Sequence, residues 1–102
     1  MFDVKAPETF KADLTIVGQG REQKLPVVFR HKTRTEYSQL LTDVSEGKVK
    51  DVDAVLALVE SWEANAELGA ETLKSLDDAQ PGALWAIVTG YSHALGVARK
   101  GN

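Results

Sequence analysis

The chain has 102 residues, of which 43% are hydrophobic and 26% charged, and its formal net charge is −3. This length and balance predict one soluble globular domain and exclude a disordered chain, which would be poorer in apolar residues. The absence of cysteine excludes disulfides, thiolate catalysis and cysteine-based zinc sites, and no stretch has the roughly 18 apolar residues of a membrane span.

Charge is distributed unevenly between the two halves of the chain. Residues 1–50 contain nine Lys or Arg against seven Asp or Glu, a balance of +2, whereas residues 51–102 contain three against eight, a balance of −5. Nucleic-acid binding depends on clustered cations that displace counterions from phosphates. The acidic second half therefore predicts no nucleic-acid binding, and the short basic stretch at Arg30, Lys32 and Arg34 does not reverse that expectation.

The first third of the chain predicts an irregular lead-in over residues 1–9 and a β-hairpin over 10–32. Apolar and polar residues alternate on both sides of a Gly-Gln-Gly turn at 18–20, which is typical of two strands with one buried face. Pro26 has no N–H to donate, so its strand should be an edge, or its missing donor should point outward. The residues predicted to face inward are Phe10, Ala12, Leu14, Ile16, Leu25, Val27 and Phe29.

Two helices are predicted next. Thr33 and Glu36 have the spacing of a capping box, and Gly47 marks the end of a helix over about 34–46. A second helix, with Asp51 as its N-cap residue, should span 51–62. Its apolar face contains Val52, Val55, Leu56, Val59 and Trp62.

Two further helices are predicted in the acidic part of the chain, a short one over 70–77 and a longer one over 80–98. Asp77 or Asp78 can cap the longer helix, and Pro81 suits its first turn. Its apolar stripe contains Leu84, Ile87, Val88, Tyr91, Leu95 and Ala98. Within that helix, close approach of another backbone is expected at Gly90 and Gly96.

Because the strands precede the helices, the pattern favours an α+β fold, in which an N-terminal β-hairpin is followed by a mainly helical bundle of three to four helices. A small helical domain that carries a hairpin describes the same order of elements. We expect a single domain over 10–98 and a C-terminal tail over 99–102.

The residue types that carry chemistry do not gather in a catalytic or metal-binding pattern. His31 and His93 lie in different predicted elements, and a metal site needs three or four convergent ligands. The turn at 18–20 joins two strands, so it lacks the helix N-terminus of a phosphate-binding loop. Asp77 and Asp78 are better explained as a helix cap than as a catalytic pair. We therefore predict no enzyme and no catalytic, cofactor-binding or metal site.

Apolar residues in an acidic setting indicate a protein-binding surface. Leu58 lies off the apolar face of its helix, either as a surface leucine or as part of an edge that faces a partner. Trp62 and Trp85 both suit the core, but Trp85, one position off the main stripe, could instead be a binding anchor. Such a domain can bind an amphipathic helix in a groove or add a strand to its sheet. The candidate partner-binding residues are Leu58, Trp62, Trp85 and Tyr91, with a rim of Glu60, Glu63, Glu67 and Glu71.

Three stretches resemble a known family: TEYSQLL from Thr35, WEANAELGAETL from Trp62 and LDDAQPGALWAIVTGY from Leu76. The last two combine an apolar segment ending in tryptophan, an acidic turn, and an Asp-x-x-Pro-Gly step that opens an aromatic-bearing helix. Together with the preceding basic hairpin they are similar to the tail assembly chaperones of long-tailed, siphovirus-type bacteriophages and prophages. The resemblance covers roughly residues 10–98.

The resemblance implies a non-enzymatic protein of the host bacterial cytoplasm that binds and solubilises the tape-measure protein. It further implies that the protein is displaced as tail-tube subunits polymerise and is absent from the mature virion. In many of these phages a ribosomal frameshift adds a C-terminal extension that recruits the tail-tube protein, and Arg99-Lys100-Gly101 could be encoded by a purine-rich slippery run. A homo-oligomer is left open, and neither a cofactor nor a membrane partner is expected.

Two other classes of protein remain as alternatives. A small DNA-binding regulator of the helix-turn-helix type would need a second helix that begins with Arg, Lys, Asn or Gln, and neither the helix from Asp51 nor that from Glu71 does. A minor structural tail component, such as a tube or connector subunit, usually has more strands than this chain supplies.

Overall fold

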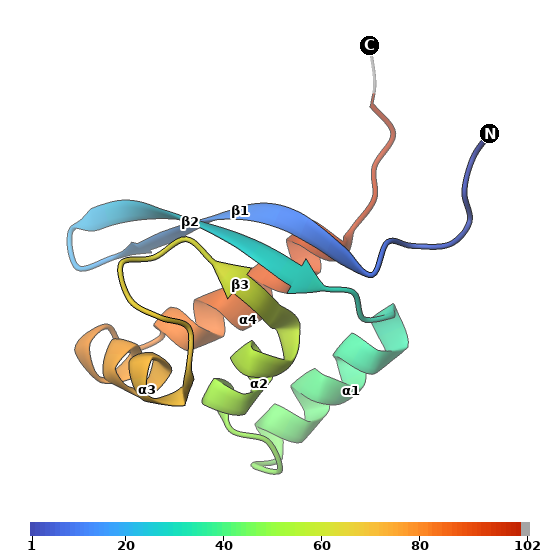
Figure 1. Cartoon of the computed structure of the whole chain (residues 1–102). Helices are drawn as coiled ribbons and strands as arrows, with labels where there is room; N and C mark the ends of the chain where they lie inside the picture. Colours follow the sequence, from blue (N-terminus) through green and yellow to red (C-terminus); the bar gives the residue numbers. More distant parts are fainter. Residues whose placement is uncertain (101–102) are drawn as a thin grey trace.

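The computed structural model describes residues 1–100, which form a three-stranded antiparallel sheet and four helices (Figure 1). The predicted α+β fold, with a hairpin before the helices, is confirmed. The last two residues of the tail predicted at 99–102 lie outside the described part of the chain. In chain order the elements are β1 (Thr9–Gly18), β2 (Arg21–Arg30), α1 (Arg34–Ser45), α2 (Asp51–Leu58), β3 (Val59–Trp62), α3 (Ala70–Ala79) and α4 (Ala83–Leu95).

The hairpin of β1 and β2 forms as its alternating pattern predicts, with the two strands paired along their whole length. Gln19 and Gly20 connect them with φ values of 53° and 78°. Two consecutive left-handed residues in a two-residue turn suit the twist of a hairpin. The Gln19 side chain also donates from Nε2 to the carbonyl of Ala79 at 2.9 Å, which ties the hairpin turn to the end of α3.

The segment predicted as the last turn of the second helix is instead a strand. α2 ends at Leu58, and β3 pairs with β2, with Trp62 opposite Val27. The apolar spacing over 51–62 suits a helix, but the hairpin leaves one edge of β2 unpaired, and residues 59–62 pair with part of that edge as a strand. β-branched Val59 and the aromatic Trp62 also favour a strand. The prediction of a helix as far as Trp62 is therefore wrong.

Pro26 lies in the central strand of the sheet, whose order is β1-β2-β3, so of the two predicted arrangements the edge strand is wrong and the outward-pointing donor remains. Its carbonyl accepts a hydrogen bond from the N–H of Glu63 at 2.9 Å. The N and C=O of one strand residue point to the same side. The missing donor of Pro26 therefore faces away from β1, at the point where β3 ends, and costs the hairpin no hydrogen bond.

The first helix begins and ends as predicted. The Thr33 side chain accepts from the N–H of Glu36, and the Glu36 carboxylate accepts from the N–H of Thr33, at 3.1 and 2.8 Å. Gly47 follows the helix with a φ of 77°.

At α2 the expected cap is wrong by one position, because Lys50 is the N-cap residue and Asp51 lies in the first turn. The Asp51 carboxylate still complements the positive end of the helix.

The predicted start of the last helix is also wrong. Asp77 and Asp78 belong to α3, which continues to Ala79, and α4 begins only at Ala83. Gly82 precedes it with a φ of 93°, a left-handed conformation that a residue without Cβ adopts at little cost. The turn between the two helices thus depends on backbone geometry rather than on a carboxylate cap. α4 ends at Leu95, so the predicted last turn, including Ala98, is not helical.

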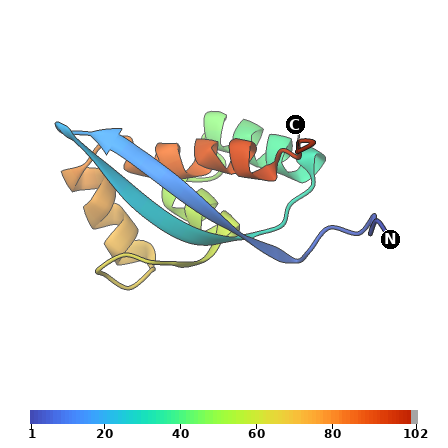
Figure 2. The same cartoon turned by 90° about the horizontal axis from the view of Figure 1, so that it is seen from above.

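All four helices lie on one face of the sheet, and the other face is open across residues 1–100 (Figure 1, Figure 2). Between the layers an aromatic cluster of Phe10, Phe29, Tyr37 and Tyr91 has ring centroids 4.9–5.8 Å apart. The backbone approach predicted at Gly90 is wrong in its partner, since the Leu14 side chain packs there instead, and a Cβ at Gly90 would lie 3.0 Å from its Cδ2. At Gly96 the expectation is wrong, because only backbone atoms of the preceding turn lie near, at 3.6 and 3.7 Å.

Candidate partner-binding site

A groove of about 520 Å³ lies between the outer half of the hairpin, the loop after β3, α3 and the start of α4. Figure 1 shows that loop passing between the sheet and α3. The groove arises because β3 pairs only with residues 27–29 of β2, so the rest of the hairpin extends past the strand that would continue the sheet. Its apolar lining residues are Ile16, Leu25, Trp62, Ala64, Ala66, Leu76, Ala79, Ala83 and Ile87.

Two hydrogen bonds fix the elements that surround the groove. The indole Nε1 of Trp62 donates to the carbonyl of Ala66 at 2.9 Å, which closes the loop after β3 into a compact turn. The bond from Gln19 to the Ala79 carbonyl holds the hairpin against α3 at the other end. Leu73 anchors α3, since its side chain is fully buried in the core. The groove is therefore part of the folded structure rather than a gap between independent segments.

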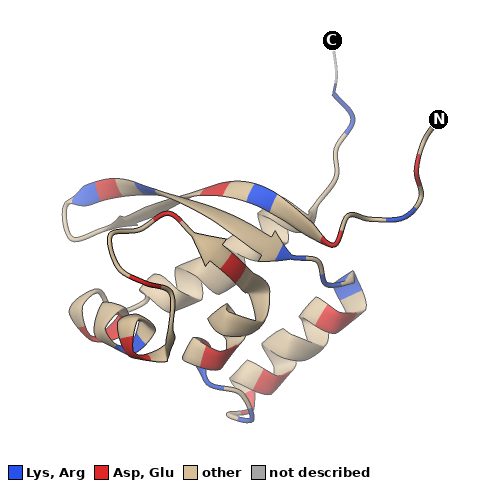
Figure 3. Ribbon diagram, in the orientation of Figure 1, with Lys and Arg blue, Asp and Glu red and all other residues tan. Residues whose placement is uncertain are grey.

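The outer side of the groove is acidic. Four exposed carboxylates lie along the loop after β3 and along α3. Figure 3 shows acidic residues in both of these segments. Glu71 and Asp78 are four residues before and three residues after the lining residue Ser75, so the three form one stripe along the helix. We call this set the acidic flank: Glu63, Glu67, Glu71 and Asp78.

The basic residues close to the groove form no ion pair with the acidic flank. Lys24 lines the groove, but its ammonium donates to Oγ1 of Thr15 at 2.8 Å. Thr15 lies directly opposite Lys24 and next to the core residue Leu14, so it points to the open face of the sheet. Lys74 is three residues after Glu71 and four before Asp78, so it lies beside these two carboxylates on α3, but it forms no ion pair with them.

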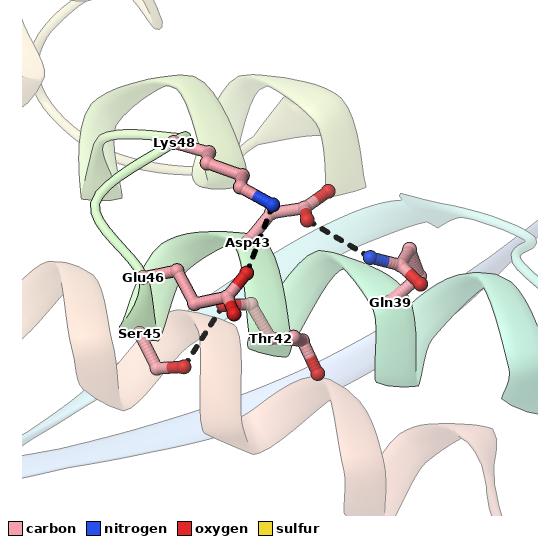
Figure 4. A network of polar contacts seen from close by, with 6 residues as sticks. All are labelled: Gln39, Thr42, Asp43, Ser45, Glu46 and Lys48. Atoms are coloured by element: carbon pink, nitrogen blue, oxygen red, sulfur yellow. Dashed lines mark hydrogen bonds and ion pairs between the residues drawn. The ribbon is translucent and has the colours of Figure 1, made fainter.

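An ion pair within the described residues 1–100 lies far from the groove, in the turn after α1. Lys48 pairs there with Glu46 at 3.0 Å, next to a hydrogen bond from Gln39 to Asp43 (Figure 4). Both charged side chains are at least half exposed, so the pair contributes little to stability. No carboxylate of the acidic flank has an ion-pair partner in this part of the chain.

The predicted partner-binding residues do not form one surface. Trp62 is half-buried and lines the groove together with the exposed Glu63, whereas Trp85 is 43% exposed on α4 and is not among the lining residues. The exposure assumed for Leu58 and Tyr91 is wrong, since both are 0% exposed. α2 contacts each of the other three helices and the sheet, so Leu58 is buried although it lies off the main apolar face. The remaining rim residues, all exposed, are Glu60, Glu67 and Glu71.

Tyr91 joins the helices to the sheet rather than presenting a binding surface. Its hydroxyl donates to the carbonyl of Arg30 at 2.9 Å and accepts from the N–H of Lys32 at 2.6 Å. The Tyr37 hydroxyl donates to the carbonyl of Val88 at 2.7 Å. Burial raises the pKa of both phenols above their ordinary value. These bonds fix α1 and α4 relative to the end of the hairpin.

Sequence reasoning missed most of the groove. The alternation of the strands places Ile16 and Leu25 on the inward face, but it does not reveal that the helices leave them half-covered. Leu76 of α3 is half-buried against the core and also lines the groove. The signal available in the sequence was the length of the hairpin strands, ten residues each, against helices of eight to thirteen residues.

Among the described residues, no group of three or more His, Asp or Glu side chains could hold a metal ion. No helix in that same part is both long and apolar enough to cross a membrane. The surface feature that the described residues do form is an apolar groove with an acidic flank.

Comparison with known proteins identifies the family. No curated protein and no solved structure matches the chain. The family model described as phage tail assembly chaperone matches residues 2–102, which is almost the entire chain. The chain therefore belongs to the phage tail assembly chaperone family.

Proposed function

We propose that this tail assembly chaperone binds the tape-measure protein, keeps it soluble in the host bacterial cytoplasm and is displaced as tail-tube subunits polymerise around it. A role in phage tail assembly, within the host cell, follows from the family. The observation that carries the finer proposal is the open apolar groove beside an acidic flank. A long helical client with exposed apolar stripes needs such a surface to remain soluble before assembly.

The proposed binding is reversible and does not involve catalysis. Burial of apolar surface contributes about 25 cal/mol per Å² to binding. The groove has a volume of about 520 Å³, so it covers only part of one or two turns of a client helix. Each copy would therefore bind weakly, and several copies along one client would act together. Weak individual contacts allow polymerising tube subunits to replace the chaperone, which explains its absence from the mature virion under this proposal.

Recruitment of the tail-tube protein by a frameshifted extension fits the same proposal. α4 ends at Leu95, and residues 96–100 lead away from the helices (Figure 1). Additional residues attached there would not disturb the core or the groove. Such an extension would bring tube subunits to a client that is already coated.

Co-expression tests the proposal. The full chain is produced together with the long helical protein encoded next to it, and the soluble fraction is separated by size-exclusion chromatography. The expected result is a soluble client that elutes with several copies of the chaperone. A client that stays insoluble while the chain elutes alone would overturn the proposal, and co-expression with an unrelated acidic protein of similar size is the control.

A further inference from the structure

We infer that the groove receives the apolar face of an amphipathic helix whose flanking residues are Lys or Arg, with the basic flank lying along α3 and the loop after β3. The inference rests on the proposed function, because it names the chemistry of the client segment. It adds which surface is used, which charge the segment carries and on which side that charge lies.

The first step concerns the shape and polarity of the groove. Large apolar side chains line opposite sides: Ile16 and Leu25 on the hairpin, and Leu76 on α3. Small residues such as Ala79 and Ala83 also line the groove, which leaves room for side chains of a partner. Volumes of roughly 300–1,000 Å³ are typical of binding sites. Half-covered apolar residues on two sides suit the side-chain stripe of a helix.

The second step concerns charge. The acidic flank carries four carboxylates along one side of the groove, and no ion pair within residues 1–100 satisfies them. The ammonium of Lys24, on the hairpin side, is bonded to Thr15 on the other face of the sheet. Arg21 lies at the hairpin turn and is not among the lining residues. An incoming helix therefore meets negative charge on one side and no matching charge on the other.

The third step excludes a segment of different polarity. An acidic helix would place like charges beside the acidic flank, and like charges at an interface oppose binding. A wholly apolar helix would leave the four carboxylates at the edge of the interface without partners. Lys or Arg at one edge of the apolar stripe forms ion pairs with them instead. Such exposed pairs select between partners more than they add affinity.

The test uses Trp62 as an internal reporter. In a Trp85→Phe variant of the full chain, Trp62 is the remaining tryptophan, and it lines the groove. Two synthetic amphipathic peptides share one leucine stripe, and their flanks carry either Lys or Glu. Trp62 emission is followed at low salt as each peptide is added. We expect the Lys-flanked peptide to shift the emission and to bind about tenfold more tightly than the Glu-flanked peptide, a preference that shrinks at high salt.

A matched pair of charge variants separates local from global electrostatics. Neutralising the acidic flank (E63Q, E67Q, E71Q and D78N) should abolish the preference for the Lys-flanked peptide. Neutralising four exposed carboxylates elsewhere (D3N, E8Q, D13N and E22Q) changes the net charge equally and should preserve it. Circular dichroism and thermal melts verify that each variant is folded. Anisotropy of a labelled peptide with the unmodified chain repeats the measurement without Trp85→Phe.

Equal affinity for both peptides, binding without a change at Trp62, or no binding of either peptide would overturn the inference. The proposed function fails separately. If the flank-neutralised chain still solubilises the client as well as the original chain, the inference is wrong and the function stands. If the original chain does not solubilise the client while Trp62 responds to the Lys-flanked peptide, the function is wrong and the groove chemistry stands.

Discussion

Tyr91 and Tyr37 each place a polar hydroxyl inside an otherwise apolar layer, and hydrogen bonding makes this tolerable. Tyr91 satisfies two backbone groups at the end of the hairpin, the carbonyl of Arg30 and the N–H of Lys32. Tyr37 donates to one carbonyl, that of Val88, inside α4. The two residues thus differ in how many backbone groups depend on them.

Tyr91→Phe is expected to destabilise the protein more than Tyr37→Phe. Loss of the Tyr91 hydroxyl leaves a donor and an acceptor without partners, at a cost of about 1–3 kcal/mol, whereas loss of the Tyr37 hydroxyl costs about 0.5–1.5 kcal/mol. Urea denaturation followed by circular dichroism measures both. Equal free energies of unfolding for the two variants would contradict the assigned roles.

The same phenols predict a loss of stability at alkaline pH. Burial raises the pKa of Tyr37 and Tyr91 in the folded state above 10.0, while the unfolded phenols titrate near that value. The folded state then binds the phenolic protons more tightly than the unfolded state does. The resulting contribution to the free energy of unfolding is complete below about pH 10 and is lost as the pH rises further. Free energies of unfolding at about pH 8 and pH 11 should differ less in a Tyr37→Phe, Tyr91→Phe double variant than in the original chain. An identical difference would exclude these residues as the cause.

At the scale of elements, each helix has its own start, and the starts differ in how visible they are in the sequence. α1 begins with two hydrogen bonds between Thr33 and Glu36. These bonds lower the pKa of Glu36, and the bond to the backbone N–H of Thr33 is the largest cause. α2, α3 and α4 have no side-chain cap. Tertiary contacts therefore position those three helices.

Thr33→Ala is expected to lower the free energy of unfolding by about 1 kcal/mol, since it removes the acceptor for the Glu36 N–H. Thr35→Ala, an exposed site in the first turn of the same helix, is the control and should change it by less than about 0.5 kcal/mol. Thermal and urea denaturation of both variants would show the difference. If Thr33→Ala proved as mild as Thr35→Ala, the capping box would not contribute to stability.

The packing of α4 against β1 depends on Gly90. Gly90→Val places a branched side chain where a single Cβ would already lie 3.0 Å from Leu14, so we expect a loss of about 1–3 kcal/mol from overpacking. Ser92→Val introduces the same residue at an exposed site of the same helix and serves as the control. A double variant that adds Leu14→Ala should recover part of the loss. Equal effects of the two valines would argue against close packing at Gly90.

At the scale of the whole molecule, the charge balance predicts that the chain does not bind DNA. The half that contains α2, α3 and α4 carries a balance of −5, from three cations and eight carboxylates, and repels a phosphate backbone. Fluorescence anisotropy of a labelled duplex at about 50 mM salt should show no saturable binding. Saturable binding that weakens with added salt would revive the helix-turn-helix alternative.

Local patterns in the sequence were sufficient for the elements that depend on neighbouring residues. The alternation of Phe10 to Ile16, the turn at 18–20 and the capping box at Thr33 each involve groups within a few residues, so their physics is visible in the chain. Family membership was likewise suggested by short motifs and is confirmed. The candidate site was only partly anticipated, through Trp62 and its acidic neighbours.

Tertiary structure decided the rest, because those features depend on which elements meet. Residues 59–62 form a strand since β2 has an edge to pair, although their spacing also suits a helix. Leu58 and Tyr91 are buried because elements pack on more than one side of their helices. The groove exists because the hairpin extends past β3 and meets α3, a length relation between segments about 60 residues apart. By itself the sequence determined the local elements and their charges; the fold determined which apolar residues remain exposed to a partner, since burial depends on contacts between distant segments.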